Sequence, residues 1–152
     1  MLKNPAMRGG PFATGLAFNA ARRELADTVI RPAINRGDVV ICDRYFPSTE
    51  IFQIAMGVGM SVEEEAFLRV LHRSLPQPDL LIFVLPSKEL WMARMSQAAD
   101  VDAFEGNAGE LDAYESYAAK AAARGPVVIL RPTHSMESMT TDSIMGLIDQ
   151  VG

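Results

Sequence analysis

The sequence predicts an α/β fold in three layers, with helices on both faces of a parallel sheet. Three short apolar runs predict the strands, at residues 39–43, 80–85 and 127–130. The first two runs lack the polar alternation of a half-exposed strand, which is typical of strands buried on both faces. Helical patterns separate the runs, and this alternation favours parallel β-α units with right-handed crossovers.

The composition predicts one globular domain over residues 1–152. Of the 152 residues, 49% are hydrophobic, which is enough for a sizeable core. A net charge of -5 argues against a nucleic-acid partner and against a polybasic membrane surface. Because the N-terminal part has no long apolar run, we expect no signal peptide, no membrane span and a cytoplasmic location. The single cysteine, Cys42, allows no disulfide within the chain and is expected to be a small buried side chain.

Before the first strand, the pattern predicts a lead-in and one long helix. Residues 1–15 hold several glycines and prolines and are expected to be flexible. Residues 16–35 have a helical pattern, in which Pro32 falls late enough to kink or end the helix. Gly37 is placed to cap the end of that helix.

After the first strand, a short helix is predicted near Ser48. Ser61 and Glu64 then form a capping box, which predicts a helix over residues 62–75. We expect its apolar side to consist of Ala66, Phe67, Val70 and Leu71. His72 has no partner His or Cys nearby in the sequence, and is predicted to be structural or to face solvent.

The remaining elements follow from similar local signals. Polar, glycine-containing residues 100–109 predict a loop between two helices. The helices in this part of the chain are predicted at residues 88–97, 110–124 and 140–151.

Asp43 and Arg44 are the first candidate functional residues, because they follow the first strand directly. In open parallel sheets, ligands bind outside the carboxyl ends of the strands. A phosphate-bearing ligand is therefore expected at this pair, with the alternative that both side chains only cap the strand and pair with neighbours.

Several short motifs occur in a characteristic order. They are Leu16-Ala17-Phe18-Asn19-Ala20-Ala21-Arg22, Val29-Ile30-Arg31-Pro32-Ala33, Gly37, Asp43-Arg44-Tyr45, Ser48-Thr49 and Pro78-Asp79-Leu80. In this order and spacing the chain resembles bacterial thymidylate kinases, a family of P-loop nucleoside monophosphate kinases, over roughly residues 16–120. The resemblance implies a partial P-loop-kinase-like sheet and transfer of a phosphoryl group from ATP to dTMP with Mg2+.

The resemblance also implies a binding site for the base and sugar of the acceptor. Phe18 would lie against the flat face of thymine, and Arg22 would donate to a base carbonyl. From its position alone, Phe18 is more simply a core residue, and Arg22 a surface charge of the helix. Phe52 stands where the family often has a Tyr near the sugar, and loss of that hydroxyl would relax discrimination against ribose.

A phosphate site is implied next to the base. Arg44 would hold the acceptor phosphate, since a guanidinium matches two oxygens. Asp43 would orient Arg44 or lie close to Mg2+, so the pair Asp43 and Arg44 are the predicted catalytic residues. Ser48 and Thr49 would contact base or phosphate as small hydroxyl donors. Glu50 stands where Gln is common in the family, which puts a negative charge near an anionic ligand.

Three parts of the family pattern are missing from the sequence. It contains no Gly-x-x-x-x-Gly-Lys-Ser/Thr, the P-loop that holds the phosphates of ATP. The lid arginine is absent too, because the corresponding stretch is Asp102-Ala103-Phe104-Glu105. The strand that normally lies in the middle of the family sheet precedes the P-loop and is also missing.

Two hypotheses of different class follow. In the first, the chain is the acceptor-nucleotide half of a thymidylate kinase, whose P-loop comes from another polypeptide or an N-terminal segment. In the second, it is a non-catalytic nucleotide-binding or interaction protein, a pseudokinase or a subunit of a split kinase, which leaves ATP and Mg2+ unused. A third, weaker reading is a kinase for a modified or non-thymine nucleotide, suggested by Glu50 and Phe52. Since the gap in the sheet would leave strand edges uncovered, we expect a homodimer or a partner chain.

Overall fold

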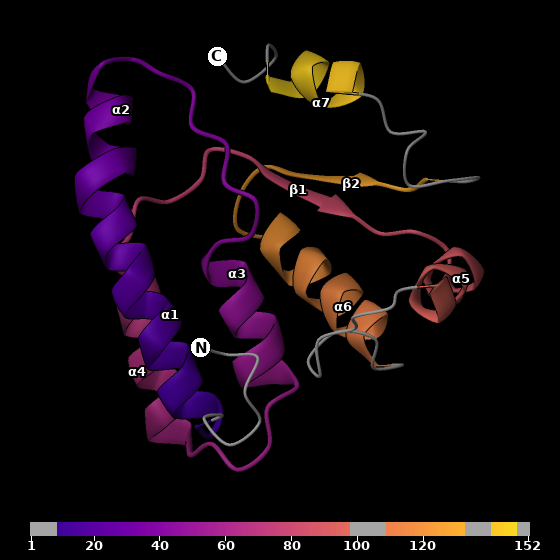
Figure 1. The fold of residues 1–152 in the computed structure, drawn as a ribbon, viewed down its shortest axis with the longest axis horizontal. Helices are drawn as coiled ribbons and strands as arrows, with labels where there is room; N and C mark the ends of the chain where they lie inside the picture. Colours follow the sequence, from indigo (N-terminus) through magenta and orange to yellow (C-terminus); the bar gives the residue numbers. More distant parts are fainter. Residues whose placement is uncertain (1–8, 98–108, 133–140, 149–152) are drawn as a thin grey trace. The chain divides into compact units, whose positions relative to one another are not determined.

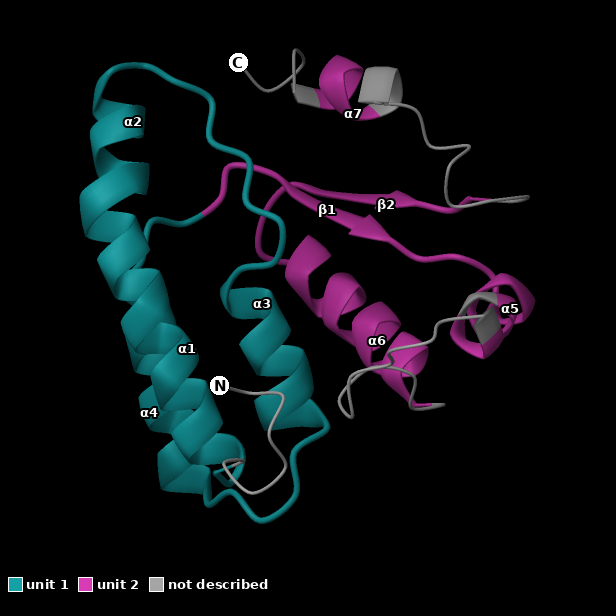
Figure 2. Ribbon diagram, viewed as in Figure 1, with its two compact units in different colours: residues 1–77 teal, residues 78–152 magenta. Residues whose placement is uncertain are grey.

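The computed structural model describes residues 9–97, 109–132 and 141–148. The chain divides into two compact units, Met1–Gln77 and Pro78–Gly152 (Figure 2). The first unit is helical, and the second contains a small parallel sheet with helices (Figure 1). An α/β fold with a parallel sheet is therefore confirmed, while the expectation of a single domain over residues 1–152 stays a prediction.

The first unit opens with a long helical segment. It consists of α1 (Pro11–Leu25), the π-helical turn η2 (Ala26–Ile30) and α2 (Arg31–Asn35). The helix begins earlier than predicted, because Pro11 has the φ angle that suits the first helical turn, where its missing N–H costs nothing. The predicted lead-in was thus too long, and its residues 1–8 lie outside the described part of the chain. Pro32 neither ends nor breaks the helix, and the wider π turn immediately before it accommodates the missing donor.

Gly37 ends this helical segment, as predicted. Its φ of +83° lies in the left-handed region, where a residue with a Cβ is disfavoured. The Gly37 N–H donates to the Ile34 carbonyl, and the Asp38 N–H donates to the Ala33 carbonyl at 3.0 Å. These two bonds form a Schellman motif, which satisfies the last carbonyls of the helix.

The strand predicted at residues 39–43 is wrong. The backbone there has no regular structure, Val39 and Ile41 are 70% and 68% exposed, and Cys42 is also exposed rather than buried. A strand is stabilised by hydrogen bonds to a neighbouring strand, and no backbone hydrogen bond within the described part of the chain involves residues 39–42. The apolar run therefore has strand-like residues without a strand to pair with.

A short helix follows, as predicted, but it begins at Phe46 rather than Ser48. It comprises α3 (Phe46–Thr49) and the π-helical η3 (Glu50–Ala55). All five residues from Glu50 to Ile54 are buried, so this helix has no exposed side over that stretch. Gly57 and Gly59 come after it, and Gly59 has a φ of +89°.

The capping box of α4 (Val62–Arg73) is confirmed. The Ser61 hydroxyl accepts from the Glu64 N–H, and the Glu64 carboxylate accepts from the Ser61 N–H at 2.8 Å. The predicted boundaries differ only by the last two residues, which form a turn after the helix.

The buried side of α4 differs from the predicted one. Phe67 and Val70 are 50% and 53% exposed, whereas Leu68 and His72 are buried. Leu68 packs against α1 at Gly15, where an added Cβ would lie only 2.8 Å from a Leu68 methyl carbon. The hydrophobic pattern alone pointed to the wrong face, because a histidine takes part in the buried one.

The second unit matches its prediction closely. The strands β1 (Leu81–Val84) and β2 (Val127–Leu130) pair in parallel, with Leu81 opposite Val127 and Val84 opposite Leu130. Burial on both faces is only partly confirmed, because Phe83 is buried but Val84 is 38% exposed. The helices are α5 (Lys88–Gln97), α6 (Glu110–Ala122) and α7 (Thr141–Ile148).

The core of the second unit forms between β1 and α6. Its buried residues are Phe83, Leu85, Leu111 and Ala118. The predicted loop at residues 100–109 lies outside the described residues except for its last one. Across the described ranges, none of the helices combines the length and apolar character needed to cross a bilayer.

Candidate functional site

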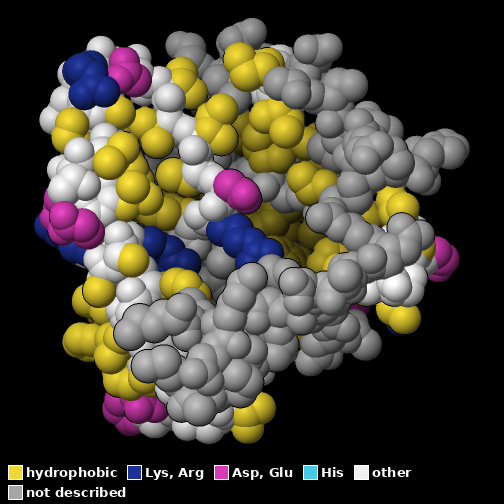
Figure 3. Space-filling model, in the orientation of Figure 1, with side chains coloured by type: hydrophobic (Ala, Val, Ile, Leu, Met, Phe, Trp, Pro, Cys, Tyr) yellow, Lys and Arg dark blue, Asp and Glu magenta, His cyan; other side chains and the backbone are white. Residues whose placement is uncertain are grey.

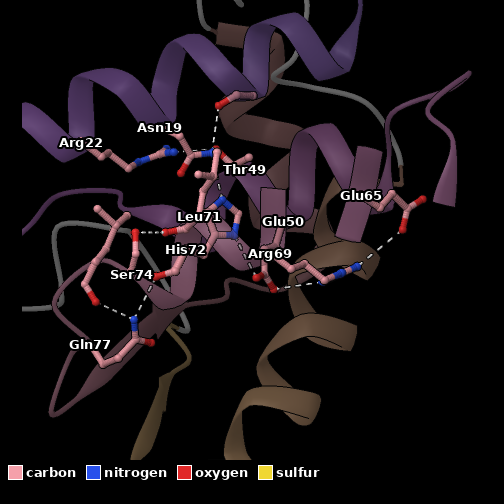
Figure 4. A network of polar contacts seen from close by, with 12 residues as sticks. Asn19, Arg22, Thr49, Glu50, Glu65, Arg69, Leu71, His72, Ser74 and Gln77 are labelled. Carbon is pink, nitrogen blue, oxygen red and sulfur yellow. Dashed lines mark hydrogen bonds and ion pairs between the residues drawn. The ribbon is translucent and has the colours of Figure 1, made fainter. Parts of the chain in front are cut away.

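Three of the predicted ligand-binding residues meet within the first unit. Phe18 and Arg22 lie one turn apart on α1, with the Arg22 guanidinium carbon 5.4 Å from the centre of the Phe18 ring. Arg22 Nη1 donates to the hydroxyl of Thr49, on α3, at 2.6 Å (Figure 4). Thr49 is fully buried, so this bond holds one end of the guanidinium in place. The other N–H groups of an arginine point in different directions from the one that donates to Thr49.

Burial shapes the electrostatics of this group. Removal from water lowers the pKa of Arg22 to about 10, an effect that nearby Tyr45 partly opposes. Arg22 nevertheless keeps its charge at neutral pH, because that value is still far above 7. Burial also raises the pKa of Tyr45, and the neighbouring Cys42 thiol adds to the rise. A desolvated cation on an aromatic ring is well suited to hold a planar ligand that carries carbonyl oxygens.

A second arginine and a second aromatic ring meet after the apolar run. The Arg44 guanidinium carbon lies 5.8 Å from the centre of the Phe52 ring, which is buried in η3. Arg44 has a φ of +62°, a left-handed conformation that is uncommon for any residue but glycine. Such conformations cluster at functional sites, where the surrounding structure maintains them.

Tyr45 joins the two arginine–aromatic pairs. It follows Arg44 in the chain and lies close enough to Arg22 to raise the pKa of that guanidinium. Its hydroxyl is buried and has no hydrogen-bond partner among the described residues. We call Phe18, Arg22, Arg44, Thr49 and Phe52 the candidate acceptor site. Sequence reasoning did not include Tyr45, although its place in the Asp-Arg-Tyr motif was the available signal.

The other two predicted site residues are less closely tied to this group. Asp43 is exposed in the loop before Arg44, and Ser48 is half-buried in α3. The described ranges contain no cluster of three metal-ligating side chains around Asp43 or elsewhere. The lid stretch at residues 102–105 lies outside the described residues.

Glu50 and His72 form a buried polar contact that sequence reasoning missed. Glu50 is 8% exposed and His72 is 2% exposed, and His72 Nδ1 lies 3.1 Å from Glu50 Oε1. Arg69 Nη1 lies 3.4 Å from the other carboxylate oxygen (Figure 4). These contacts account for the unusual Glu50, because its charge is directed toward His72 and Arg69. The prediction that His72 is structural agrees with this geometry, and the alternative that it faces solvent is wrong.

The described surface includes a groove and many apolar side chains. Figure 3 shows hydrophobic side chains spread over the viewed face. A groove of about 410 Å³ runs between α1 and α4, and it is lined mainly by apolar atoms from Leu16, Asn19, Ala20, Arg23, Leu71, Ser74 and Leu75. None of the predicted site residues lines this groove.

The small parallel sheet, the helices and the arginine–aromatic site define a helix-rich α/β protein with the features of a partial P-loop-kinase-like fold. The sequence profile of the thymidylate kinase family matches residues 7–142. The chain therefore belongs to the thymidylate kinase family.

Individual relatives agree with the family match. A thymidylate kinase of Pseudomonas fluorescens is 37% identical over 139 residues, which cover 90% of this chain and 65% of the relative. A thymidylate kinase of Thermomicrobium roseum is 40% identical over 102 residues, which cover 65% of this chain and 46% of the relative. The chain thus spans less than two thirds of the length of these curated relatives.

Proposed function

We propose that this chain is the acceptor-nucleotide part of a thymidylate kinase and binds dTMP. The observation that carries the proposal is the contact of Arg22 with both Phe18 and Thr49. The Phe18 ring offers a flat apolar face to thymine, and N–H groups of Arg22 are available to a base carbonyl. Thr49 acts here mainly by holding Arg22 in place.

The phosphate of dTMP would bind at Arg44. Its guanidinium stands at the end of an exposed loop and can donate two parallel hydrogen bonds to phosphate oxygens. Asp43 directly precedes Arg44 and Ser48 follows it by four residues, and in this proposal both help to orient the phosphate. Phe52 packs below Arg44 and presents no hydroxyl to the sugar.

The two cofactors of the family differ in how well these residues suit them. A lone exposed carboxylate such as Asp43 is compatible with Mg2+, which usually binds one or two carboxylates together with substrate phosphates and water. The 152 residues contain no P-loop sequence, so they do not suit the triphosphate of ATP. Phosphoryl transfer would require a P-loop from another polypeptide or from a segment outside these residues.

Calorimetric titration with dTMP tests the proposal. Arg22→Ala and Arg44→Ala should each weaken binding roughly 10- to 150-fold, because a charge-assisted hydrogen bond contributes about 1.5–3 kcal/mol. Arg23→Ala is the matched control, since Arg23 is adjacent but exposed and pairs with Asp27. Its affinity should stay within about twofold of the parent. A folded parent chain that does not bind dTMP would overturn the proposal.

The alternative is a non-catalytic nucleotide-binding or interaction protein, which the missing P-loop favours. The proposal of a thymidylate kinase half and this alternative predict different results when a P-loop segment is supplied. A thymidylate kinase half should then form ADP in a dTMP-dependent way, and a non-catalytic protein should not. ADP formation by the chain alone would contradict both.

A further inference from the structure

A buried chain of hydrogen bonds links α4 to the two elements that carry the candidate acceptor site. His72 Nε2 lies 3.2 Å from Asn19 Nδ2 on α1, and His72 Nδ1 lies 3.1 Å from Glu50 Oε1 on η3 (Figure 4). Asn19 Nδ2 also donates to the Gly15 carbonyl at 2.9 Å. The Phe46 ring stacks on the imidazole, with the ring centres 5.5 Å apart.

These contacts indicate which nitrogen of His72 carries the proton. An amide nitrogen can only donate, so His72 Nε2 must accept from Asn19. The proton of a neutral imidazole is then on Nδ1, which donates to the Glu50 carboxylate. The reversed orientation of the Asn19 amide is disfavoured, because it would place Oδ1 against the Gly15 carbonyl oxygen.

Each partner of His72 is adjacent to a residue of the candidate acceptor site. Asn19 follows Phe18 and lies three residues before Arg22 on the same helix. Glu50 follows Thr49 and lies two residues before Phe52. His72, on α4, thus links α1 to the α3–η3 segment, the same two parts of the chain that the Arg22–Thr49 bond joins.

We propose that His72 is a positioning residue for the candidate acceptor site. Its Nδ1–H fixes Glu50 and its Nε2 fixes Asn19, and the two bonds together set the separation between α1 and α3–η3. That separation determines whether Arg22 reaches Thr49 and keeps its place over Phe18. The part of this inference that concerns dTMP rests on the proposed function, whereas the positioning of Arg22 is a property of the chain without ligand.

Two substitutions of His72 each remove one of the two hydrogen bonds of the imidazole and keep the other. His72→Asn places an amide donor near Nδ1 and keeps a bond to Glu50, whereas His72→Gln places an amide oxygen near Nε2 and keeps a bond to Asn19. Since each loses one of the two bonds, both should bind dTMP about tenfold more weakly than the parent. Arg73→Ala is the matched control, because Arg73 is the next residue on α4 but is exposed, and its affinity should stay within about twofold of the parent.

Nuclear magnetic resonance of the ligand-free chain tests the positioning separately. Long-range proton–nitrogen correlations should show the proton of His72 on Nδ1. The signals of Arg22 and Thr49 should move in both His72 variants and stay in place in Arg131→Ala, a control in the second unit where Arg131 pairs with Glu115.

Failure of the inference can be told from failure of the proposed function. A parent chain that does not bind dTMP but shows the expected resonance pattern removes the proposed function and keeps the positioning role. Protonation at Nε2, or Arg22 and Thr49 signals that do not respond to either variant, would overturn the positioning role. So would His72 variants that are less stable than the parent but bind dTMP equally well.

Discussion

Two apolar runs of similar composition have different structures in this protein. Residues 81–84 form β1, and each residue has a partner in β2. Residues 39–42 are even richer in β-branched side chains, yet they form no strand and expose Val39 and Ile41. The difference teaches that a β-propensity is a preference for a paired, half-buried environment, and that the neighbouring strand supplies most of the stability.

The largest difference between the two runs should appear on truncation of an apolar side chain. Phe83→Ala should lower the free energy of unfolding by about 3–5 kcal/mol, because the ring is buried in the core of the second unit. Ile41→Ala should change it by less than about 0.5 kcal/mol, because the side chain is 68% exposed. Urea unfolding followed by circular dichroism measures both. Equal losses would show that residues 39–42 are buried in solution.

A second test concerns the turn that leads into the unpaired run. Gly37→Ala should destabilise the chain by roughly 1–2 kcal/mol, because alanine is disfavoured at a φ of +83°. Gly125→Ala is the control, since that glycine lies outside the left-handed region and an added Cβ would meet no atom within 4 Å. The same urea titration compares the two. If both variants were equally stable, the Schellman motif would contribute nothing to the end of α2.

The third test concerns the residue that follows the run. Arg44→Gly and Arg44→Ala both remove the guanidinium, so both should weaken dTMP binding by the same roughly 10- to 150-fold in calorimetry. Only Arg44→Gly removes the cost of the left-handed conformation, which is about 1 kcal/mol or more. It should therefore be more stable than Arg44→Ala by that amount. Equal thermal stabilities would mean that the loop adopts an ordinary conformation in solution.

The smallest expected effect on stability comes with a change in self-association. Ile41→Lys should leave the free energy of unfolding within about 0.5 kcal/mol of the parent, since the side chain is exposed. We expect the chain to associate through this unpaired segment, and a lysine there should reduce the association seen by light scattering, because it discourages strand pairing between chains. Val58→Lys, at another exposed valine, is the control. Association that persists unchanged would place the contact between copies elsewhere.

Most of the fold could be predicted wherever the signal is local. The Ser61 capping box, the Gly37 cap, α5 and β2 all follow from residues within one or two turns of each other. The error at residues 39–43 has a non-local cause, because the run itself is strand-like and only its missing partner decides the outcome.

In the candidate site, too, some residues could be predicted from the sequence and others depended on distant partners. Phe18 and Arg22 were predicted through the family resemblance, and they are found in contact. The link between Glu50 and His72 joins residues 22 positions apart, and no spacing rule connects them. The available signal was Glu50, an acidic residue at the start of a largely apolar stretch, residues 50–54. A buried carboxylate needs a hydrogen-bond donor or a cation beside it, and His72 and Arg69 are those partners.

The enclosed helix of residues 50–54 has a consequence for how the gene tolerates change. Most helices have a permissive side, so that neutral and harmful codons alternate along them. Here five successive residues are buried, so we expect a replacement at any of the five positions to disturb packing. Random mutagenesis should therefore find almost no neutral amino-acid replacements at residues 50–54. These residues are thus the wrong place for a label or an affinity tag.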